Sequence, residues 1–332
     1  MKIAIVGCGA VGSFYGARLA RAGHETHFLL RSDYAAVRQA GVQIHSPEGD
    51  FIAHPVAAAS PSEIGPAELV IVALKTTANH RLPELIPPLL GPRTRIVTLQ
   101  NGLGNEEQLA ALAPEPGSVL GGLCFVCLNR TAPGVVRHLA HGDIVLGEHG
   151  RAPGPATAAL GEEFKRAGIR CRLTPNLAQA HWEKLVWNVP FNGLGVAGIA
   201  GHEALESGEV PVTLSGRRTL PTDELLADER WAAIALELMQ EVVAAARALG
   251  YPVAGDFPAA MMSRTRSMGP YRASTLLDFE AGAPLELESL FLEPLRQAQS
   301  AGLATPRLHC LCAVLTELDR RRRARGVPNP AG

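Results

Sequence analysis

Three polar residues in the second half of the chain have a spacing that could support catalysis. Lys184, Asn188 and Asn192, in the segment AHWEKLVWNVPFNGLG, recur every four residues and would follow one face of a helix. An ammonium group beside two carboxamides can donate hydrogen bonds, or a proton, to an oxygen on which negative charge develops. The alternative is an exposed polar stripe. Pro190 predicts a kink or an end of this helix, which would re-aim Asn192.

A second candidate site lies near the start of the chain, where GCGAVG follows the apolar run IAIV. Its G-x-G-x-x-G pattern stands between a predicted strand and a predicted helix, the context required of a dinucleotide-binding loop. The first glycine permits a tight turn, the second lets the backbone approach a pyrophosphate, and the third allows close packing of helix and strand. A purely structural strand–turn–helix is the alternative. The candidate cofactor-binding residues are Gly7, Cys8, Gly9, Ala10, Val11 and Gly12.

The end of the second predicted strand, ETHFLL, indicates which nucleotide is bound. NAD-binding proteins usually carry Asp or Glu there to bind the ribose 2′-hydroxyl, whereas here Arg31 and Ser32 follow the strand. A guanidinium can hold a 2′-phosphate through two hydrogen bonds, and a carboxylate would repel it. The sequence therefore favours NADP, although Asp33 is close enough to keep NAD open.

Two further predicted strands end in polar residues. LVIVALKTT places Lys75 after one strand, and IVTLQNGLG places Gln100 and Asn101 after another. The carboxyl ends of parallel strands line the cofactor crevice of such sheets, so Lys75 and Asn101 are candidate cofactor-binding residues. A solvated lysine and an ordinary Asn-Gly turn are the alternatives.

The elements that must position these residues change character along the chain. Up to about residue 174, short apolar strands alternate with helical segments, which predicts a parallel sheet covered on both faces. Strand-like pieces separated by turn compositions then predict an antiparallel extension. We expect strands at 2–6, 25–30, 69–74, 95–99, 119–128, 135–139, 144–147 and 169–173, and helices at 11–22, 79–90 and 156–167.

From residue 175 onward, long helical patterns replace the strands. Helices are predicted at 176–189, 227–249, 275–279, 287–301 and 305–323, with Thr305 as the N-cap of the last and Pro306 in its first turn. The expected fold is therefore an α/β Rossmann domain over residues 1–174, holding NADP, and an all-α domain over residues 175–332, holding the substrate.

The composition narrows the function classes. Of 332 residues, 31 are basic and 32 acidic, a net charge of −1, so we expect no nucleic-acid partner. No apolar run reaches the ~20 residues of a membrane helix, and no secretory signal is present, which favours a cytoplasmic protein. Among six cysteines, Cys124 and Cys127 form C-x-x-C. Buried thiols are favoured there over a zinc or redox site. The run RRRRAR at 320–325 is typical of a solvated helix end rather than a basic address.

The ordered set of motifs resembles the ketopantoate reductase family, also called 2-dehydropantoate 2-reductases. The resemblance covers nearly the whole chain, from KIAIVGCGAVG through LLR, LK, QNGLG and HWEKLVWNVPFN to S-x-x-x-D and GAPLELES. It implies a Rossmann domain and a helical C-terminal domain of the 6-phosphogluconate dehydrogenase-like type. It also implies reduction of 2-dehydropantoate to pantoate with NADPH, on the route to pantothenate and coenzyme A.

The resemblance implies a role for each matching residue. Lys184 would be the catalytic lysine, which polarises the keto oxygen and protonates the alkoxide. Glu286 would be the catalytic acid that orients the substrate hydroxyl and supports the lysine. The other matches bind substrate or cofactor: Ser274 the substrate carboxylate, Asn192 a further part of the substrate, Asn101 and Asn188 the nicotinamide and substrate, and Arg31 the 2′-phosphate.

Several departures leave the substrate open. Phe291 and Leu292 stand where the family often has Asn and Gly, which predicts a bulkier, more apolar pocket edge, and Glu288 stands near Glu286 with an open role. A paralogue acting on another 2-oxo acid is the main alternative, and a non-catalytic NADP-binding sensor is a second. An opine-type dehydrogenase would need a histidine–acid pair that is not evident. The family suggests a homodimer through the helical domain.

Overall fold

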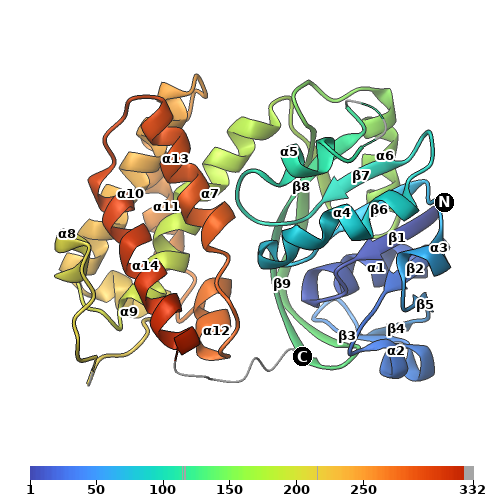
Figure 1. Cartoon of the computed structure of the whole chain (residues 1–332), viewed down its shortest axis with the longest axis horizontal. Helices are drawn as coiled ribbons and strands as arrows, with labels where there is room; N and C mark the ends of the chain where they lie inside the picture. The colour runs from blue at the N-terminus through green and yellow to red at the C-terminus, as the bar shows by residue number, and fades with distance from the viewer. Residues whose placement is uncertain (114, 116, 215, 325–332) are drawn as a thin grey trace. The chain divides into compact units, whose positions relative to one another are not determined.

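The computed structural model describes residues 1–113, 115, 117–214 and 216–324. The chain divides into two compact units, Met1–Ala180 and His181–Gly332, and the division falls within one helix, α7 (Leu177–Ala197). Figure 1 shows strands gathered in the first unit and helices in the second. The predicted fold class, a mostly parallel α/β sheet with an antiparallel extension followed by helices, is confirmed.

Within the described residues, the N-terminal unit contains one sheet of ten strands in the order β4-β3-β9-β8-β7-β6-β1-β2-β5, with β10 paired to β9. Neighbouring strands are parallel except β8 with β9 and β3 with β4. The strands are β1 (Lys2–Val6), β2 (Glu25–Leu29), β3 (Val42–His45), β4 (Phe51–Ala53), β5 (Val56–Ala58), β6 (Leu69–Val72), β7 (Arg95–Thr98), β8 (Val119–Ala132), β9 (Val135–Glu148) and β10 (Cys171–Leu173).

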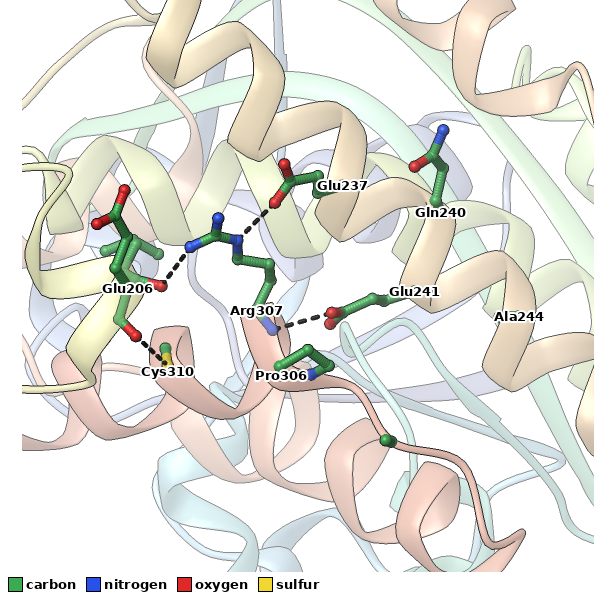
Figure 2. A pocket seen from close by; sticks show the side chains of 10 residues that line it. Glu206, Glu237, Gln240, Glu241, Ala244, Pro306, Arg307 and Cys310 are labelled. Atoms are coloured by element: carbon green, nitrogen blue, oxygen red, sulfur yellow. Dashed lines mark hydrogen bonds and ion pairs between the residues drawn. The ribbon is translucent and has the colours of Figure 1, made fainter.

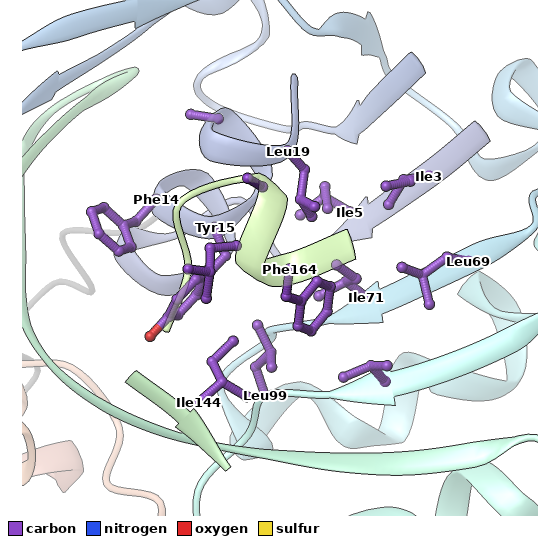
Figure 3. Packing of buried hydrophobic residues seen from close by; sticks show 14 of the residues in the cluster. Ile3, Ile5, Phe14, Tyr15, Leu19, Leu69, Ile71, Leu99, Ile144 and Phe164 are labelled. Atoms are coloured by element: carbon purple, nitrogen blue, oxygen red, sulfur yellow. The ribbon is translucent and has the colours of Figure 1, made fainter. Parts of the chain in front are cut away.

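Helices cover both faces of this sheet because its central strands are apolar on both sides. Along β1, Ile3 and Ile5 join one buried cluster, and Ala4 and Val6 join the other. Figure 3 shows the first cluster, in which side chains of α1 and α6 pack on the strands. The helices of this unit are α1 (Ala10–Arg21), α2 (Tyr34–Ala40), α3 (Pro61–Ile64), α4 (Leu82–Leu85), α5 (Asn105–Ala110) and α6 (Pro155–Arg166).

The prediction of one continuous helix over 79–90 is wrong. The structure has a 3₁₀ turn, η1 (Thr76–Arg81), then the single turn of α4, and then a second 3₁₀ turn, η2 (Pro87–Leu89). Pro83 lies in the first turn of α4, and Pro87 and Pro88 follow it. Proline lacks an amide hydrogen and clashes with the preceding turn, so the apolar periodicity here cannot produce a longer helix.

The prediction of separate strands at 135–139 and 144–147 is also wrong. Strand β9 runs without interruption from Val135 to Glu148 against β8. The register shifts near His141, which has a φ of 67°. The segment AHGD, which resembles a turn, is therefore an irregularity inside a long strand, and β8 and β9 form a hairpin with strands of 14 residues each.

The C-terminal unit is helical throughout its regular structure. Helix α7 begins after Asn176, whose side-chain oxygen accepts a hydrogen bond from the Gln179 amide at 3.0 Å. It then continues through Pro190 to Ala197, so of the two predicted effects of Pro190, a kink or an end of the helix, the end is wrong. The other elements are α8 (Ala204–Ser207), α9 (Thr222–Ala227), α10 (Glu229–Ala248), α11 (Phe257–Arg266), α12 (Ser274–Glu280), the π-helical turn η3 (Glu288–Leu292), α13 (Glu293–Ser300) and α14 (Pro306–Ala324).

The start of α14 is capped by a residue that the sequence did not indicate. Thr305 precedes the helix as predicted, but its buried hydroxyl has no hydrogen-bond partner among the described residues. The Glu241 carboxylate, on α10, instead accepts from the amides of Arg307 at 2.9 Å and Leu308 at 2.8 Å. The helix extends to Ala324, and Arg325 and the GVPNPAG tail lie outside the described residues.

No disulfide joins any of the six cysteines, all of which lie in the described part of the chain. Cys124 is buried and Cys127 partly buried on β8. Burial raises the pKa of the Cys171 thiol to about 11 and that of Cys312 to about 12, so both remain protonated near neutral pH. No helix among the described residues has the length and apolarity needed to cross a membrane.

Candidate functional site

The three glycines of the N-terminal loop meet different surroundings. A Cβ atom on Gly7, whose φ is 101°, would lie 2.3 Å from the Leu74 amide nitrogen. A Cβ atom on Gly12 would lie 2.2 Å from the Gly7 carbonyl oxygen. At Gly9 a Cβ atom would meet nothing within 4 Å, so this glycine leaves open space in front of the loop. The first and third glycines are required by packing of the protein itself.

The loop is fastened at the start of α1. The Ser13 hydroxyl donates to the Cys8 carbonyl at 3.0 Å, and the Ser13 amide donates to the Gly9 carbonyl at 3.0 Å. Helix α1 has no acidic residue in its first turn, so no carboxylate of that turn opposes the positive end of the helix dipole. This arrangement fits a dinucleotide pyrophosphate, which helix N-termini bind through backbone amides.

The residues after β2 separate into an exposed cation and a buried anion. Arg31 is exposed, whereas the Asp33 residue is only 6% exposed. The Asp33 carboxylate accepts both Arg130 Nε, at 3.0 Å, and Arg130 Nη2, at 2.6 Å. Arg130 lies on β8 and had not been indicated by any sequence pattern. Lys75 is exposed three residues after the end of β6 and directly precedes η1.

A chain of side-chain amides, with Gln100 and Asn105 buried and Asn79 partly buried, joins the segments that follow β6 and β7. Gln100 Nε2 donates to the Leu74 carbonyl at 3.0 Å and to Asn79 Oδ1 at 2.7 Å. Asn79 Nδ2 then donates to Asn105 Oδ1 at 3.0 Å, and Asn105 Nδ2 donates to the Asn101 carbonyl at 3.1 Å. Because a backbone carbonyl at each end only accepts, every amide in this relay has one orientation.

This amide relay, formed by Gln100, Asn79 and Asn105, connects the segments that carry two predicted cofactor residues. Leu74 directly precedes Lys75, and the other end of the relay is Asn101 itself. The turn after Asn101 needs glycine, because Gly102 and Gly104 have φ values of 87° and 84°. Asn79 and Asn105 were missed from the sequence, since neither belongs to a recognisable motif.

Helix α7 carries Lys184, Asn188 and Asn192 along one face without a break. Lys184 is partly buried, and Asn188 and Asn192 are buried, with 8% and 3% of their surfaces exposed. The alternative of an exposed polar stripe is therefore excluded by their burial. A partly buried cation beside two buried amides is the donor arrangement that the sequence suggested.

Asn192 and Ser274 are brought together although they lie far apart in the chain. Asn192 Oδ1 accepts from Ser274 Oγ at 3.2 Å and from the Thr275 amide at 3.0 Å. These bonds give the Thr275 amide, in the first turn of α12, a hydrogen-bond acceptor. They occupy the carboxamide oxygen of Asn192. They leave Asn192 Nδ2 as the donor end of the side chain and hold the Ser274 hydroxyl next to α7.

An aromatic group fixes α7 beside the segment that leads into α12. The Trp187 ring lies 5.2 Å from that of Phe191 and 5.9 Å from that of Tyr271, between ring centroids. Trp187 Nε1 also donates to Thr265 Oγ1 on α11 at 3.0 Å. Trp187 and Tyr271 were missed as positioning residues because no local pattern connects positions 84 residues apart.

The two glutamates of LELES occupy different environments. Glu286 is 4% exposed and directly precedes the helical turn that leads into η3. The Glu288 side chain is 63% exposed and forms an ion pair with Arg296. Glu288 therefore does not share the buried position of Glu286. A π-helical turn is uncommon and is often found at functional sites, here immediately after Glu286.

The departures at Phe291 and Leu292 do not form an exposed apolar edge. Phe291 is fully buried, and a Cβ atom on Gly193 would lie 3.0 Å from its ring. Its carbonyl accepts the Cys312 thiol. Phe291 is thus a core residue packed on α7, and Leu292 is partly buried. The bulkier, more apolar pocket edge, which the segment after Asn192 also suggests, remains a prediction.

A cavity of about 620 Å³ lies elsewhere in the C-terminal unit and contains none of the predicted site residues. Figure 2 shows its polar side, where Arg307 donates to Glu237 and its backbone amide to Glu241. Cys310 closes one end through a hydrogen bond to the Glu206 carbonyl. These groups already satisfy one another, which indicates that they stabilise the junction of α8, α10 and α14.

Comparison with known proteins gives consistent matches along the chain. The family model described as "Ketopantoate reductase PanE/ApbA" matches residues 3–151. The model described as "Ketopantoate reductase PanE/ApbA C terminal" matches residues 213–319. One model thus falls within each compact unit.

Relatives match over nearly their full length. The 2-dehydropantoate 2-reductase of Nostoc sp. (strain PCC 7120) is 39% identical over 328 residues, covering 97% of this chain and 96% of that protein. The crystal structure of 2-dehydropantoate 2-reductase from Geobacter metallireducens GS-15 is 41% identical with a TM-score of 0.86, covering 96% and 99%. D-mandelate dehydrogenase, solved with NADH and anilino(oxo)acetate, shares the fold at 19% identity, with a TM-score of 0.83 and 97% and 99% coverage. The chain belongs to the ketopantoate reductase family.

Proposed function

We propose that this protein reduces 2-dehydropantoate to pantoate with NADPH. The observation that carries the proposal is the face of α7, where Lys184 stands one turn from buried Asn188 and two turns from buried Asn192. The chain shares its family with 2-dehydropantoate 2-reductases that it matches over nearly their full length. A proton donor, positioned amides and a nucleotide loop are the parts that carbonyl reduction requires.

Each side chain of the C-terminal unit has a role in this proposal. Lys184 donates a hydrogen bond to the keto oxygen and then its proton to that oxygen as the carbonyl carbon receives a hydride. The nicotinamide supplies that hydride when it is bound. Glu286 orients the substrate hydroxyl and holds Lys184 in place, and Ser274 binds the substrate carboxylate. Asn188 and Asn192 orient the substrate through their amide donors.

The N-terminal unit is proposed to hold NADP rather than NAD. Gly7 to Gly12 receive the pyrophosphate, and Asn101 and Lys75 approach the cofactor from the ends of neighbouring strands. Arg31, exposed after β2, supplies a fork of donors for the 2′-phosphate. Asp33, the residue that would favour NAD, is buried in an ion pair with Arg130.

Turnover of defined substrates tests the reaction. Purified protein is mixed with NADPH and 2-dehydropantoate, and NADPH absorbance is followed against a panel of other 2-oxo acids. We expect 2-dehydropantoate to have the highest kcat/KM. Faster turnover of another 2-oxo acid would support the paralogous reductase instead. Tight NADPH binding with no turnover of any 2-oxo acid would support the non-catalytic sensor.

A single variant tests the nucleotide. Arg31→Ala should weaken NADPH binding roughly 10-fold or more, because a charge-assisted, bidentate contact to the 2′-phosphate is lost. NADH, which lacks this phosphate, should be almost unaffected. Equal weakening of both nucleotides, measured by calorimetric titration, would contradict the assignment of Arg31.

A further inference from the structure

Asp33 lies close to the place in a Rossmann sheet where an acid normally selects NAD. It follows Arg31 by two residues, four residues after the end of β2, and a free carboxylate near this strand end could accept hydrogen bonds from the ribose hydroxyls. Asp33 also directly precedes α2, where aspartate is a favoured capping residue, but its side chain makes no capping bond to that helix. Its carboxylate is therefore used for something other than its local role.

The carboxylate of Asp33 has donors on both oxygens. Oδ1 accepts from Arg130 Nη2 at 2.6 Å and from Ser32 Oγ at 2.9 Å. Oδ2 accepts from Arg130 Nε at 3.0 Å and from the Gly134 amide at 3.0 Å. Two carboxylate oxygens offer about four acceptor positions in all. Four donors therefore occupy the acceptor positions that a ribose hydroxyl would need.

The charge of Asp33 also reaches the nucleotide loop. Burial, and after it the negative charge of Asp33, raises the pKa of the Cys8 thiol well above its ordinary value. Cys8 stands between the first two glycines of the loop, so Asp33 lies near the nucleotide-binding residues. An unpaired carboxylate in this place would repel a 2′-phosphate, whereas the guanidinium of Arg130 balances its charge.

We infer that Arg130 determines the preference for NADP by neutralising Asp33. The inference rests on the proposed function, since it requires that this unit binds a nicotinamide dinucleotide. Arg130 acts as a specificity-determining residue from the β8–β9 hairpin, 97 positions from Asp33 in the chain. Asp33 would favour NAD through its free acceptor atoms and its negative charge. The guanidinium of Arg130 occupies the acceptor atoms and balances the charge. Arg31 attracts the 2′-phosphate, and Arg130 removes the repulsion between that phosphate and the carboxylate of Asp33.

Substitution of Arg130 is the direct test. Arg130→Gln releases the carboxylate while keeping a polar side chain of similar length. We expect the Kd for NADPH to rise roughly 10-fold or more and the Kd for NADH to stay the same or fall, so that the preference shifts toward NADH. Calorimetric titration of both nucleotides measures the ratio. Equal weakening of the two nucleotides would overturn the inference and leave Arg130 as a structural tie of the hairpin.

A double variant separates an effect through Asp33 from direct contact with the phosphate. In Arg130→Gln/Asp33→Asn the carboxylate charge is absent, so NADPH affinity should return to within about threefold of the wild-type value. Asp33→Asn alone should keep the preference for NADPH. If the double variant binds NADPH as poorly as Arg130→Gln, the inference is wrong, because the loss does not pass through Asp33.

Two controls keep the test decisive. If Arg130→Gln fails to fold, Arg130→Met replaces it, since methionine keeps an apolar stem in the same place but lacks both the charge and the fork. We expect it to lower the NADPH-to-NADH preference by about threefold or more, and an unchanged preference overturns the inference. Wild-type protein that binds neither nucleotide would overturn the proposed function and this inference together. If the wild-type protein prefers NADPH and the Arg130 variant keeps this preference, only this inference is overturned and the proposed function stands.

Discussion

The glycine loop of the N-terminal unit and the polar face of α7 differ in the part of the chain that shapes them. At the glycine loop the backbone determines the shape, because Gly7 and Gly12 have no room for a side chain and Gly9 leaves open space. On α7 the polar side chains determine the character of the face, and Asn192 is held there by Ser274 and Thr275 of α12. In the proposed function, the first region binds the cofactor and the second supplies the reactive groups.

This difference affects what a single substitution can do. A backbone-built surface is lost when a side chain is added, and the damage extends to packing of the sheet. A face built from side chains can lose its chemistry while the helix remains intact. Variants in the two regions should therefore separate binding and stability from catalysis.

The largest effect is expected at Lys184. Lys184→Ala should lower kcat by roughly 100-fold or more, because the proton donor for the alkoxide is removed. Lys184→Arg keeps the positive charge but cannot release a proton near neutral pH, so it should also be slow while KM changes little. Steady-state kinetics measures both variants. Activity of Lys184→Arg close to wild type would mean that charge alone, and not proton transfer, is required.

The glycine loop offers a matched pair of variants. Gly7→Ala should destabilise the ligand-free protein by about 2–4 kcal/mol, because the new methyl group meets the Leu74 amide and φ is positive. Gly9→Ala should leave the ligand-free protein as stable as wild type and weaken nucleotide binding roughly 10-fold. Urea unfolding and nucleotide titration give the two quantities. Equal stability losses in both variants would show that Gly9 is also a packing residue.

A smaller effect on rate is expected from the amide relay. Asn79→Ala removes its central member and should lower kcat roughly threefold to tenfold, because the segments bearing Lys75 and Asn101 lose their fixed spacing. Asn79→Asp keeps the acceptor for Gln100 but loses the donor to Asn105, and should lie between Asn79→Ala and wild type. Thr77→Ala, an exposed position in the same 3₁₀ turn, is the control. A change in stability without a change in kcat would restrict the relay to a structural role.

The smallest effect on activity is expected from Glu148, in the N-terminal unit. Burial alone would raise its pKa, but hydrogen bonds from Thr157, the Gly154 amide and Arg151 hold the pKa below its ordinary value. A depressed folded pKa stabilises the protein above the unfolded value near 4.5, and this contribution is lost as pH falls through the folded value. Glu148→Gln should cost about 1–3 kcal/mol at pH 7 and much less in acid.

Hydrogen exchange of backbone amides around Glu148 measures this loss of stability in the N-terminal unit. The three tryptophans, Trp182, Trp187 and Trp231, all lie in the C-terminal unit, so their fluorescence reports that unit separately. If acid weakens Glu148→Gln as much as wild type, the cause lies in other carboxylates.

Patterns of adjacent residues predicted the elements that interactions between neighbouring residues determine. The strand before Gly7 and the helix after it follow from a few adjacent residues, and β1 has the predicted bounds. No single helix spans 79–90, because three prolines prevent the helix that the apolar spacing predicts. The strand expected to break at AHGD was wrong because pairing with β8 outweighs a turn composition.

The site was predictable in its residue types but not in its supports. The polar residues of α7 and the cation after β2 can be recognised from spacing and charge. The partners Arg130, Asn105 and Thr275 cannot be recognised in this way. Arg130 and Thr275 bond to residues distant in the chain, and Asn105 belongs to no motif. The different burial of Glu286 and Glu288 likewise depends on how the chain enters η3.

The bond from Glu241 to the start of α14 has a consequence for folding. The amides that it accepts lie 66 and 67 positions away, so the first turn of α14 is completed by another helix. Alone in water, this helix would fray at its N-terminus, because Thr305 makes no capping bond of its own. Completion of that turn and assembly of α10 with α14 are therefore a single step, which ties the last helix of the chain to a helix formed much earlier during synthesis.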